Sequence, residues 1–263
     1  MKTVSSWAVA LALTALVSAC SQDDEEEKND PTPAVKATVV SAGGNINAKL
    51  DEFRALLGTP VNTTPNQTAG RREVNWDGVP ANLTNVNTFP GDFFNNTDPN
   101  GPAGRKRGLV TTISGGGAGA GFRISDNDFA DLAASNGDQF NAFSPARTFA
   151  TVGVNHHDVT FQVPGTTTAA TVKGFGVVFS DVDDANATTM EFFEGDKSLG
   201  KFKAPVRSDA AGISFLGVFF PENKVSRVRV TTGNTALGAN VTDGGSYDLV
   251  VVDDFLYDEP KAN

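Results

Sequence analysis

The sequence predicts an all-β protein, built as a two-sheet, jelly-roll-like sandwich with one or two short helices near the N-terminal part. From Gly108 onward, short runs rich in Val and Phe alternate with turns rich in Gly, Asn, Asp and Thr, which is the pattern of strands joined by turns. Ten such runs recur at roughly even spacing, and this favours a sandwich of two sheets. The chain has no internal repeat of about 20 to 50 residues, which argues against a repeat architecture.

The first nineteen residues have the parts of an export signal. Lys2 supplies the positive charge, and Trp7 to Val17 form an apolar core that is too short to span a hydrocarbon layer of about 30 Å. We therefore predict a signal peptide at residues 1–19. An ordinary secretory signal that is cut near Ala19 is the alternative to the lipoprotein signal described next.

The signal ends in Leu16-Val17-Ser18-Ala19-Cys20, which resembles the lipobox of bacterial lipoproteins. The resemblance implies cleavage before Cys20, a diacylglyceryl thioether on its sulfur and an acyl chain on its amine. Several chains anchor a protein firmly, since each buried methylene contributes about 0.8 kcal/mol. The resemblance thus predicts a lipid-anchored protein of the outer membrane that contacts the bilayer through Cys20. No second cysteine is present, so an internal disulfide is excluded.

Residues 20–36 are predicted to be a disordered tether behind the lipidated cysteine. The tract from Asp23 to Glu27 is entirely acidic, and a block of like charges without apolar partners stays extended. Prolines at 31 and 33 stiffen its exit. The tract is at least a spacer. It also resembles the surface-export signal of lipoproteins from the Bacteroides and Flavobacterium group, which implies exposure at the cell surface.

The charge of the chain argues against nucleic acid as a partner. The whole chain carries a net charge of −10; loss of Lys2 makes this −11, and residues 21–36 contribute six acids and two lysines, which leaves −7 on the folded part. Nucleic acid phosphates need a basic face. The acidic balance instead suits a neutral ligand or divalent cations.

A helix is predicted over residues 46–57. Gly58 suits the position after its last turn, and Pro60 prevents its continuation. A second short helix is expected over Asp126–Ala134. The prediction of the first helix is based on four apolar residues at spacings of four, three and four, which share one helix face: Ile46, Leu50, Phe53 and Leu57.

Residues 37–263 are predicted to form the sandwich domain, with the helix and a long loop excursion in residues 37–107. Residues 59–107 are rich in Asn, Pro, Gly and Thr and show little periodicity. Four aromatic residues in this stretch need burial, because exposed they would form a large apolar patch. We therefore expect an ordered excursion across the domain, anchored by Trp76, Phe89, Phe93 and Phe94.

Strands are predicted from Gly108 to the C-terminus. In one of them Val228 and Val230 face the core and Arg227 and Arg229 face solvent. Strands that are apolar on both faces are expected at the centre of a sheet. The predicted strands are Leu109–Ile113, Gly121–Ile124, Phe149–Val154, Val159–Val163, Val172–Val182, Thr188–Phe193, Ser198–Phe202, Ile213–Phe220, Ser226–Thr232 and Tyr247–Tyr257.

The stretch from Gly174 to Pro260 includes Gly-Phe-Gly-Val-Val-Phe-Ser-Asp-Val-Asp-Asp and Val-Val-Asp-Asp-Phe-Leu-Tyr. It resembles uncharacterised bacterial exported β-sandwich domains, and its last strand is similar to that of galactose-binding-like jelly rolls and related carbohydrate-binding modules. The segment from Gly70 to Val79 also looks like part of such exported proteins. The resemblance implies a sandwich that binds a glycan.

Five aspartates form the candidate metal site, and the candidate cofactor is calcium. Each group ends or interrupts an apolar strand, and carboxylates so close together repel unless a cation or donors satisfy them. In the resembling modules an aspartate of the final strand binds structural calcium, which implies Asp253 or Asp254. The alternative is that the acids cap turns or pair with Arg207, Arg227 or Arg229. The candidate ligands are Asp181, Asp183, Asp184, Asp253 and Asp254.

The candidate glycan site is Trp76 with its polar neighbours Asp77 and Arg72. A sugar site uses an exposed aromatic platform flanked by hydrogen-bonding groups. The alternative is that Trp76 is a partly buried anchor of the long excursion.

No catalytic residue is predicted. His156 and His157 are the only histidines, and without a third ligand they do not define a zinc site. The glycine-rich run at 115–121 precedes a strand and not a helix, so it does not bind a dinucleotide. The sequence thus favours an envelope or cell-surface lipoprotein that binds an extracellular ligand, foremost a glycan. A polysaccharide-acting hydrolase and a structural or adhesive surface protein are the alternatives.

Overall fold

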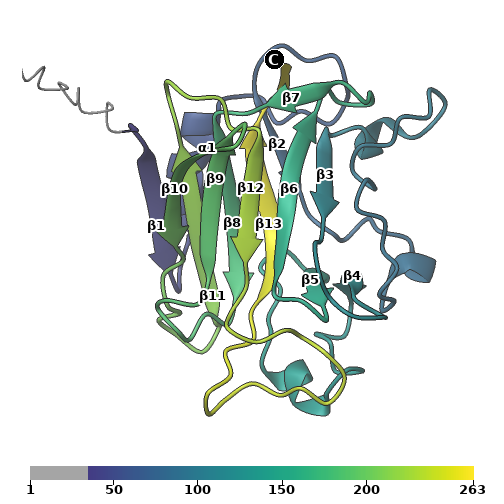
Figure 1. Cartoon of the computed structure of the whole chain (residues 1–263), viewed down its shortest axis with the longest axis vertical. Helices are drawn as coiled ribbons and strands as arrows, with labels where there is room; N and C mark the ends of the chain where they lie inside the picture. The colour runs from purple at the N-terminus through teal and green to yellow at the C-terminus, as the bar shows by residue number, and fades with distance from the viewer. Residues whose placement is uncertain (1–34) are drawn as a thin grey trace, which may run out of the picture. The chain divides into compact units, whose positions relative to one another are not determined.

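Two antiparallel sheets pack face to face in the computed structural model, which describes residues 35–263 (Figure 1). The predicted all-β two-sheet sandwich is confirmed. The predicted signal peptide, Cys20 and residues 20–34 of the tether lie outside the described residues. Residues Val35–Asn263 form one compact unit.

The first sheet contains seven strands, and two of its central strands, β8 and β13, are buried over almost their whole length. Its strand order is β1 (Thr38–Gly43), β11 (Ile213–Phe219), β8 (Gly174–Ser180), β13 (Val251–Asp258), β5 (Thr148–Val152) and β4 (Gly121–Ser125), and β2 (Arg71–Val74) also pairs with β13.

The second sheet also contains seven strands and has β10 at one edge. The register of β10 against its neighbour shifts between Ser198 and Gly200, which marks a bulge. The strand order is β10 (Lys197–Lys203), β9 (Thr189–Glu194), β12 (Arg227–Thr231), β6 (His156–Gln162), β7 (Ala169–Thr171) and β14 (Lys261–Ala262), and β3 (Leu109–Thr112) pairs with β6.

All ten predicted strands are present with shifted ends, and four further strands, β1, β2, β7 and β14, escaped prediction. Two of the four are only two or three residues long. Strand β2 has the polar sequence Arg71-Arg72-Glu73 before Val74, which gives no strand signal of its own. It forms because it pairs with the buried β13.

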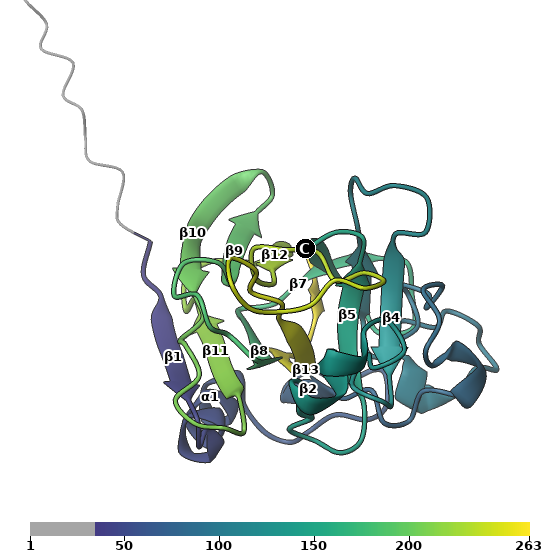
Figure 2. The same cartoon turned by 90° about the horizontal axis from the view of Figure 1, so that it is seen from below.

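Helix α1 (Asn47–Leu57) confirms the first predicted helix, and all four residues of its apolar stripe are buried. The helix covers the outer face of the first sheet beside β1 and β11 (Figure 2). Glycines make room for Phe53, because a Cβ on Gly176 or on Gly217 would lie only 2.7 Å from an atom of its ring. The alternation of Gly and Phe in β8 thus gives one face to the helix and the other to the interior.

The second predicted helix, over residues 126–134, is wrong. The segment is a series of turns followed by the 3₁₀ helix η3 (Ala134–Asp138). Asp128 and Phe129 have φ angles of 52° and 60°, which a right-handed helix does not allow. The turn is held by Ser125, whose Oγ accepts a hydrogen bond from the Phe129 amide at 2.8 Å.

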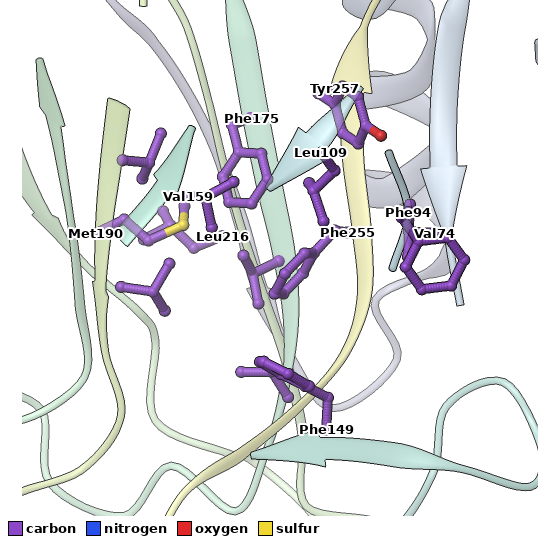
Figure 3. Packing of buried hydrophobic residues seen from close by; sticks show 14 of the residues in the cluster. Val74, Phe94, Leu109, Phe149, Val159, Phe175, Met190, Leu216, Phe255 and Tyr257 are labelled. Atoms are coloured by element: carbon purple, nitrogen blue, oxygen red, sulfur yellow. The ribbon is translucent and has the colours of Figure 1, made fainter. Parts of the chain in front are cut away.

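The interior between the sheets is dominated by aromatic and branched side chains (Figure 3). Phe149, Phe175 and Phe255 come from three strands of the first sheet, while Val159 and Met190 come from the second. The ring centroids of Phe175 and Phe255 are 5.3 Å apart. Alternate residues of β8 and β13 supply this layer. The residues between them are also buried, on the other face of the sheet, and this is why both strands read as continuous apolar runs.

The long excursion is ordered and packs its aromatic residues inward, as predicted. Trp76, Phe89, Phe93 and Phe94 are all buried. The excursion includes the 3₁₀ helices η1 (Ala81–Leu83) and η2 (Ala103–Arg105), and it lies at the side of the sandwich that carries β3, β4 and β5 (Figure 1).

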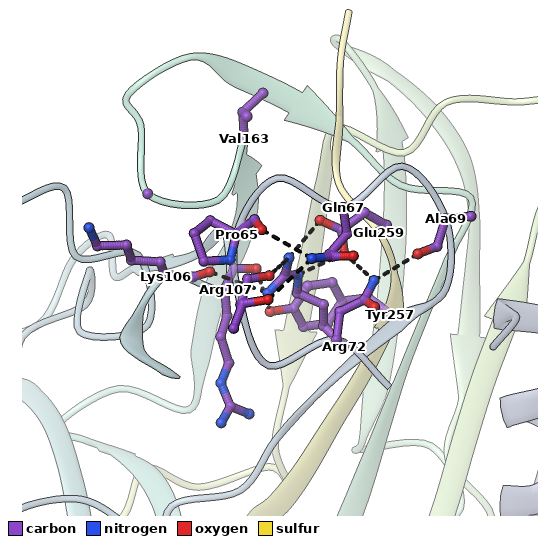
Figure 4. A network of polar contacts seen from close by, with 12 residues as sticks. Pro65, Gln67, Ala69, Arg72, Lys106, Arg107, Val163, Tyr257 and Glu259 are labelled. Carbon is purple, nitrogen blue, oxygen red and sulfur yellow. Dashed lines mark hydrogen bonds and ion pairs between the residues drawn. The ribbon is translucent and has the colours of Figure 1, made fainter. Parts of the chain in front are cut away.

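A fully buried ion pair between Arg72 and Glu259 fastens the excursion to the C-terminal end of β13 (Figure 4). The contact is bidentate: Nε of Arg72 lies 2.8 Å and Nη2 lies 2.7 Å from the two carboxylate oxygens. Arg72 also donates to the carbonyl oxygens of Thr64 and Lys106, and Asn62 donates to Glu259 at 2.7 Å. These extra donors and acceptors offset the cost of removing both charges from water.

His157 on β6 is buried among aromatic rings and has no hydrogen-bond partner for either ring nitrogen. Its ring centroid lies 5.4 Å from that of Phe149 and 6.2 Å from that of Phe255. Burial lowers the pKa of His157 to about 3, because a charged imidazolium in this apolar layer would lose its hydration. The histidine therefore acts as a neutral core residue.

We predict that His157 makes the fold sensitive to acid. The unfolded chain binds a proton on this residue below about pH 6.5, whereas the folded chain does so only near pH 3, so stability falls as the pH drops between these values. The loss amounts to roughly 3 kcal/mol by pH 4. Denaturant unfolding at pH 7, 5.5 and 4 should show a shallower decline for His157→Leu than for the parent.

The matched control is His156→Gln, whose side chain is only half-buried. It should follow the parent at all three pH values. Equal declines for the parent and for His157→Leu would contradict the assignment of the acid sensitivity to His157.

Candidate metal site

Three aspartates meet where β8 ends. Oxygen atoms of Asp181, Asp183 and Asp243 all lie within 4.8 Å of one another, so these carboxylates could hold a metal ion. Asp181 follows the last residue of β8 with a φ angle of 71°, and its amide donates to the carbonyl oxygen of Gly212 at 2.7 Å. This turn places the buried Asp181 beside the exposed Asp183.

A cavity of about 360 Å³ adjoins this group, and Asp248 lines it. Asp248 is only 3% exposed, and its Oδ2 atom has no hydrogen-bond partner. Its Oδ1 atom accepts a hydrogen bond from the Asp183 amide at 3.1 Å. Burial raises the pKa of Asp248 to about 6, and the charges of Asp243 and Asp183 add to this effect. The lining is polar: Asp183, Asp184, Asn234, Asp243, Gly244, Gly245, Ser246, Tyr247 and Asp248.

Arg207 is the counter-charge that the structure provides. Its Nε donates to Oδ1 of Asp183, and its Nη1 lies 3.1 Å from Oδ1 of Asp181 without hydrogen-bond geometry. Burial raises the pKa of Asp181 in spite of this contact. One guanidinium faces four carboxylates, counting Asp243 and Asp248, so the site keeps an excess of negative charge that a cation would offset.

The five aspartates predicted from the sequence therefore lie at two separate places in the structure. Asp181 and Asp183 belong to the group, whereas Asp184 lines the cavity and accepts a hydrogen bond from the Asn186 amide at 2.8 Å, as a turn cap does. Asp253 and Asp254 lie elsewhere, at a register shift in the pairing of β13 with β8.

Asp253 and Asp254 are satisfied by donors of one loop. Oδ2 of Asp253 accepts the amides of Phe143 and Ser144 at 2.6 and 2.9 Å, and the hydroxyl of Ser144 donates to Asp254 at 2.8 Å. Burial raises the pKa of both carboxyls, and repulsion from Asp254 raises that of Asp253 further. These hydrogen bonds hold the loop in place, and they give Asp253 and Asp254 a structural role.

The predicted glycan site does not have the required exposure. Trp76 is 1% exposed, its ring stacks on Phe149 with centroids 4.4 Å apart, and its Nε1 donates to the carbonyl oxygen of Asp253 at 2.7 Å. It cannot serve as a platform for a sugar, and it anchors the excursion instead. Asp77 accepts the amide of Arg147 at 3.1 Å, and Arg72 is the buried partner of Glu259.

Sequence reasoning missed Asp243 and Asp248, although a signal for Asp248 exists. Strands β8 and β13 are antiparallel neighbours, with Val251 opposite Ser180. The residues that follow β8 and those that precede β13 must therefore lie at the same edge of the sheet. Asp248 precedes the apolar run of β13 just as Asp181 follows that of β8.

Comparison with protein-family models, with curated proteins and with solved structures found no match to this chain. None of the helices within residues 35–263 has the length and hydropathy that a membrane crossing requires.

Proposed function

We propose that this chain is a lipid-anchored protein of the bacterial outer membrane, exposed at the cell surface, whose β-sandwich binds a glycan and holds calcium at its acidic loop site. The observation that carries the proposal is the export signal that ends in the lipobox and the single cysteine. The acidic tract behind Cys20 supports exposure at the surface. The sandwich architecture and the resemblance of Gly174 to Pro260 support a binding module.

Calcium suits the acidic site for reasons of size and chemistry. Oxygen ligands lie about 2.3 to 2.6 Å from Ca²⁺, so two of them on one ion are separated by at most about 5 Å. The oxygens of Asp181, Asp183 and Asp243 meet this condition at 4.8 Å or less. The remaining ligands of a six- to eight-coordinate ion would come from Asp248 and the carbonyl groups of the 243–247 loop.

The same distance favours cation binding over glycoside hydrolysis. The two carboxyl groups of a glycosidase stand about 5 to 9.5 Å apart, because a sugar or a water molecule must fit between them. The oxygens of Asp181, Asp183 and Asp243 are closer together than that. This group of three aspartates is therefore better suited to hold a cation than to hydrolyse a glycosidic bond.

The first prediction from this proposal concerns the anchor. In a bacterial host, the parent protein should fractionate with the outer membrane, and mass spectrometry of its mature N-terminus should show acyl chains on Cys20. Cys20→Ser should yield a protein without acyl chains that leaves the membrane fraction. Recovery of an intact chain from the cytosol, with residues 1–19 still attached, would contradict the proposal.

The second prediction concerns the cation. At a hundredfold excess over its Kd, calcium should stabilise the fold by about 2.7 kcal/mol and raise the melting temperature by roughly 5 to 10 °C over the value in chelator. Asp243→Asn should abolish this shift while keeping the hydrogen bond from the Leu249 amide to its side-chain oxygen.

Asp196→Asn is the matched control, since Asp196 is exposed in the turn between β9 and β10. It should retain the full response to calcium. Melting curves of the parent that coincide in calcium and in chelator would remove the metal from the proposal.

The third prediction concerns the glycan. The full-length chain, purified in detergent, should bind a defined subset of a glycan array and should release no sugar from the glycans that it binds. Release of reducing ends would identify a hydrolase. Adhesion to cells without affinity for any glycan on the array would identify a structural or adhesive protein.

A further inference from the structure

The excursion contains a second cavity, of about 420 Å³, which no predicted site residue lines. Its volume falls in the range of about 300 to 1,000 Å³ that small-molecule sites occupy. The lining combines aromatic, proline and arginine side chains and contains no acid: Asn75, Gly78, Pro80, Phe93, Phe94, Pro102, Gly104, Arg105 and Arg107.

The two arginines of this cavity stand out in an acidic protein. The chain has thirty-one acids against twenty-one lysines and arginines, so a carboxylate partner is easily supplied. Arg105 and Arg107 nevertheless have no carboxylate partner within residues 35–263, whereas seven of the ten arginines do: Arg54, Arg71, Arg72, Arg123, Arg207, Arg227 and Arg229.

Both guanidinium groups are held in place by neutral groups. The guanidinium carbon of Arg105 lies 3.8 Å from the centroid of the Phe93 ring, and its Nε donates to the Phe93 carbonyl at 3.3 Å. Arg107 donates from Nε to the carbonyl of Gly104 at 2.7 Å and from Nη1 to that of Glu73. Both terminal nitrogens of Arg105 and one of Arg107 remain without a protein acceptor in the described chain.

Hydrogen bonds to backbone carbonyl groups fix the position of Arg107. The hydroxyl of Tyr257 donates to its carbonyl oxygen at 3.0 Å, and Nη1 of Arg72 donates to the carbonyl oxygen of Lys106 at 3.2 Å. Figure 4 shows the side chain of Arg107 directed away from the Arg72–Glu259 pair. Burial lowers the pKa of Arg107, and the neighbouring charge of Arg72 lowers it further, so the attraction of a bound anion would offset the cost to the charged guanidinium group.

We propose that this cavity binds an acidic sugar, with the carboxylate of a uronic acid residue on Arg105 and Arg107. The proposal rests on the proposed glycan-binding function and names its ligand class and its site. Planar guanidinium groups bind carboxylates in bidentate fashion, and such charge-assisted hydrogen bonds are about twice as strong as neutral ones. The apolar face of the sugar ring lies against the exposed rings of Pro80 and Pro102, and the exposed amide of Asn75 reaches its hydroxyl groups.

The test is calorimetric titration of the full-length chain in detergent with three probes: a trimer of galacturonic acid, the neutral trimer of galactose, and galactose sulfate. The parent should bind the galacturonic acid trimer at least roughly tenfold more tightly than the neutral trimer. Arg105→Gln and Arg107→Gln should each lose about tenfold or more of this affinity.

Arg227→Gln is the matched control. Arg227 also stacks on a phenylalanine, at 3.6 Å from the centroid of Phe193, but it lies outside the cavity and pairs with Asp158. This variant should bind the galacturonic acid trimer like the parent. Each variant should still unfold in one cooperative transition above the temperature of the titration, which separates loss of binding from loss of fold.

The outcomes separate this inference from the proposed function. Equal affinity for the neutral and the acidic trimer, unchanged in Arg105→Gln, overturns the acidic-sugar site and leaves glycan binding intact. Tighter binding of galactose sulfate than of the uronic acid overturns the choice of a carboxylate. Binding of other array glycans without either trimer overturns the inference alone, whereas no binding to any glycan overturns both.

Discussion

The buried pair of Arg72 and Glu259 is the contact on which the arrangement of the long excursion depends. Removing two charges from water costs several kcal/mol per ion, and only close geometry with further hydrogen bonds offsets this cost. Here the pair is bidentate, and carbonyl oxygens of Thr64 and Lys106 accept two of the three remaining guanidinium hydrogens. These contacts fix the positions of strand β2, two loops and the end of β13 relative to one another. The backbone at residues 105–107, which presents the two arginines without carboxylate partners, is held by the same network.

The protein handles its crowded aspartates in two different ways. Asp253 and Asp254 are closed off, because amides and a hydroxyl of the 143–144 loop donate to them. Asp183, Asp243 and Asp248 line a cavity with Asp181 beside them, and within residues 35–263 the guanidinium group of Arg207 pairs with Asp181 and Asp183. The first arrangement satisfies its carboxylates from within the fold. The second leaves negative charge that a ligand from outside can satisfy.

The sequence was most informative where the signal is local. The stripe of α1 and the alternation of Val228 and Val230 follow from periodicity alone, and both are confirmed. Strand β2 was missed because its stability comes from β13, which is far away in the chain. Asp181 and Asp183 were found beside their strand, whereas Asp243 reaches them only through a loop whose course no local pattern determines. Trp76 was ambiguous, since its charged neighbours in sequence suggest exposure while its partners in space, Phe149 and Asp253, bury it.

The edge strand β10 bears on how two copies of this protein would meet at high local concentration. An open edge offers unpaired amides and carbonyls to a neighbouring copy and so invites aggregation through intermolecular sheet extension. Strand β10 carries exposed lysines at 197, 201 and 203 and a bulge between Ser198 and Gly200. The lysines repel the same edge of another copy, and the bulge spoils the regular spacing that such an extension needs. Pairing of two copies through the β10 edge is therefore disfavoured even at high local concentration.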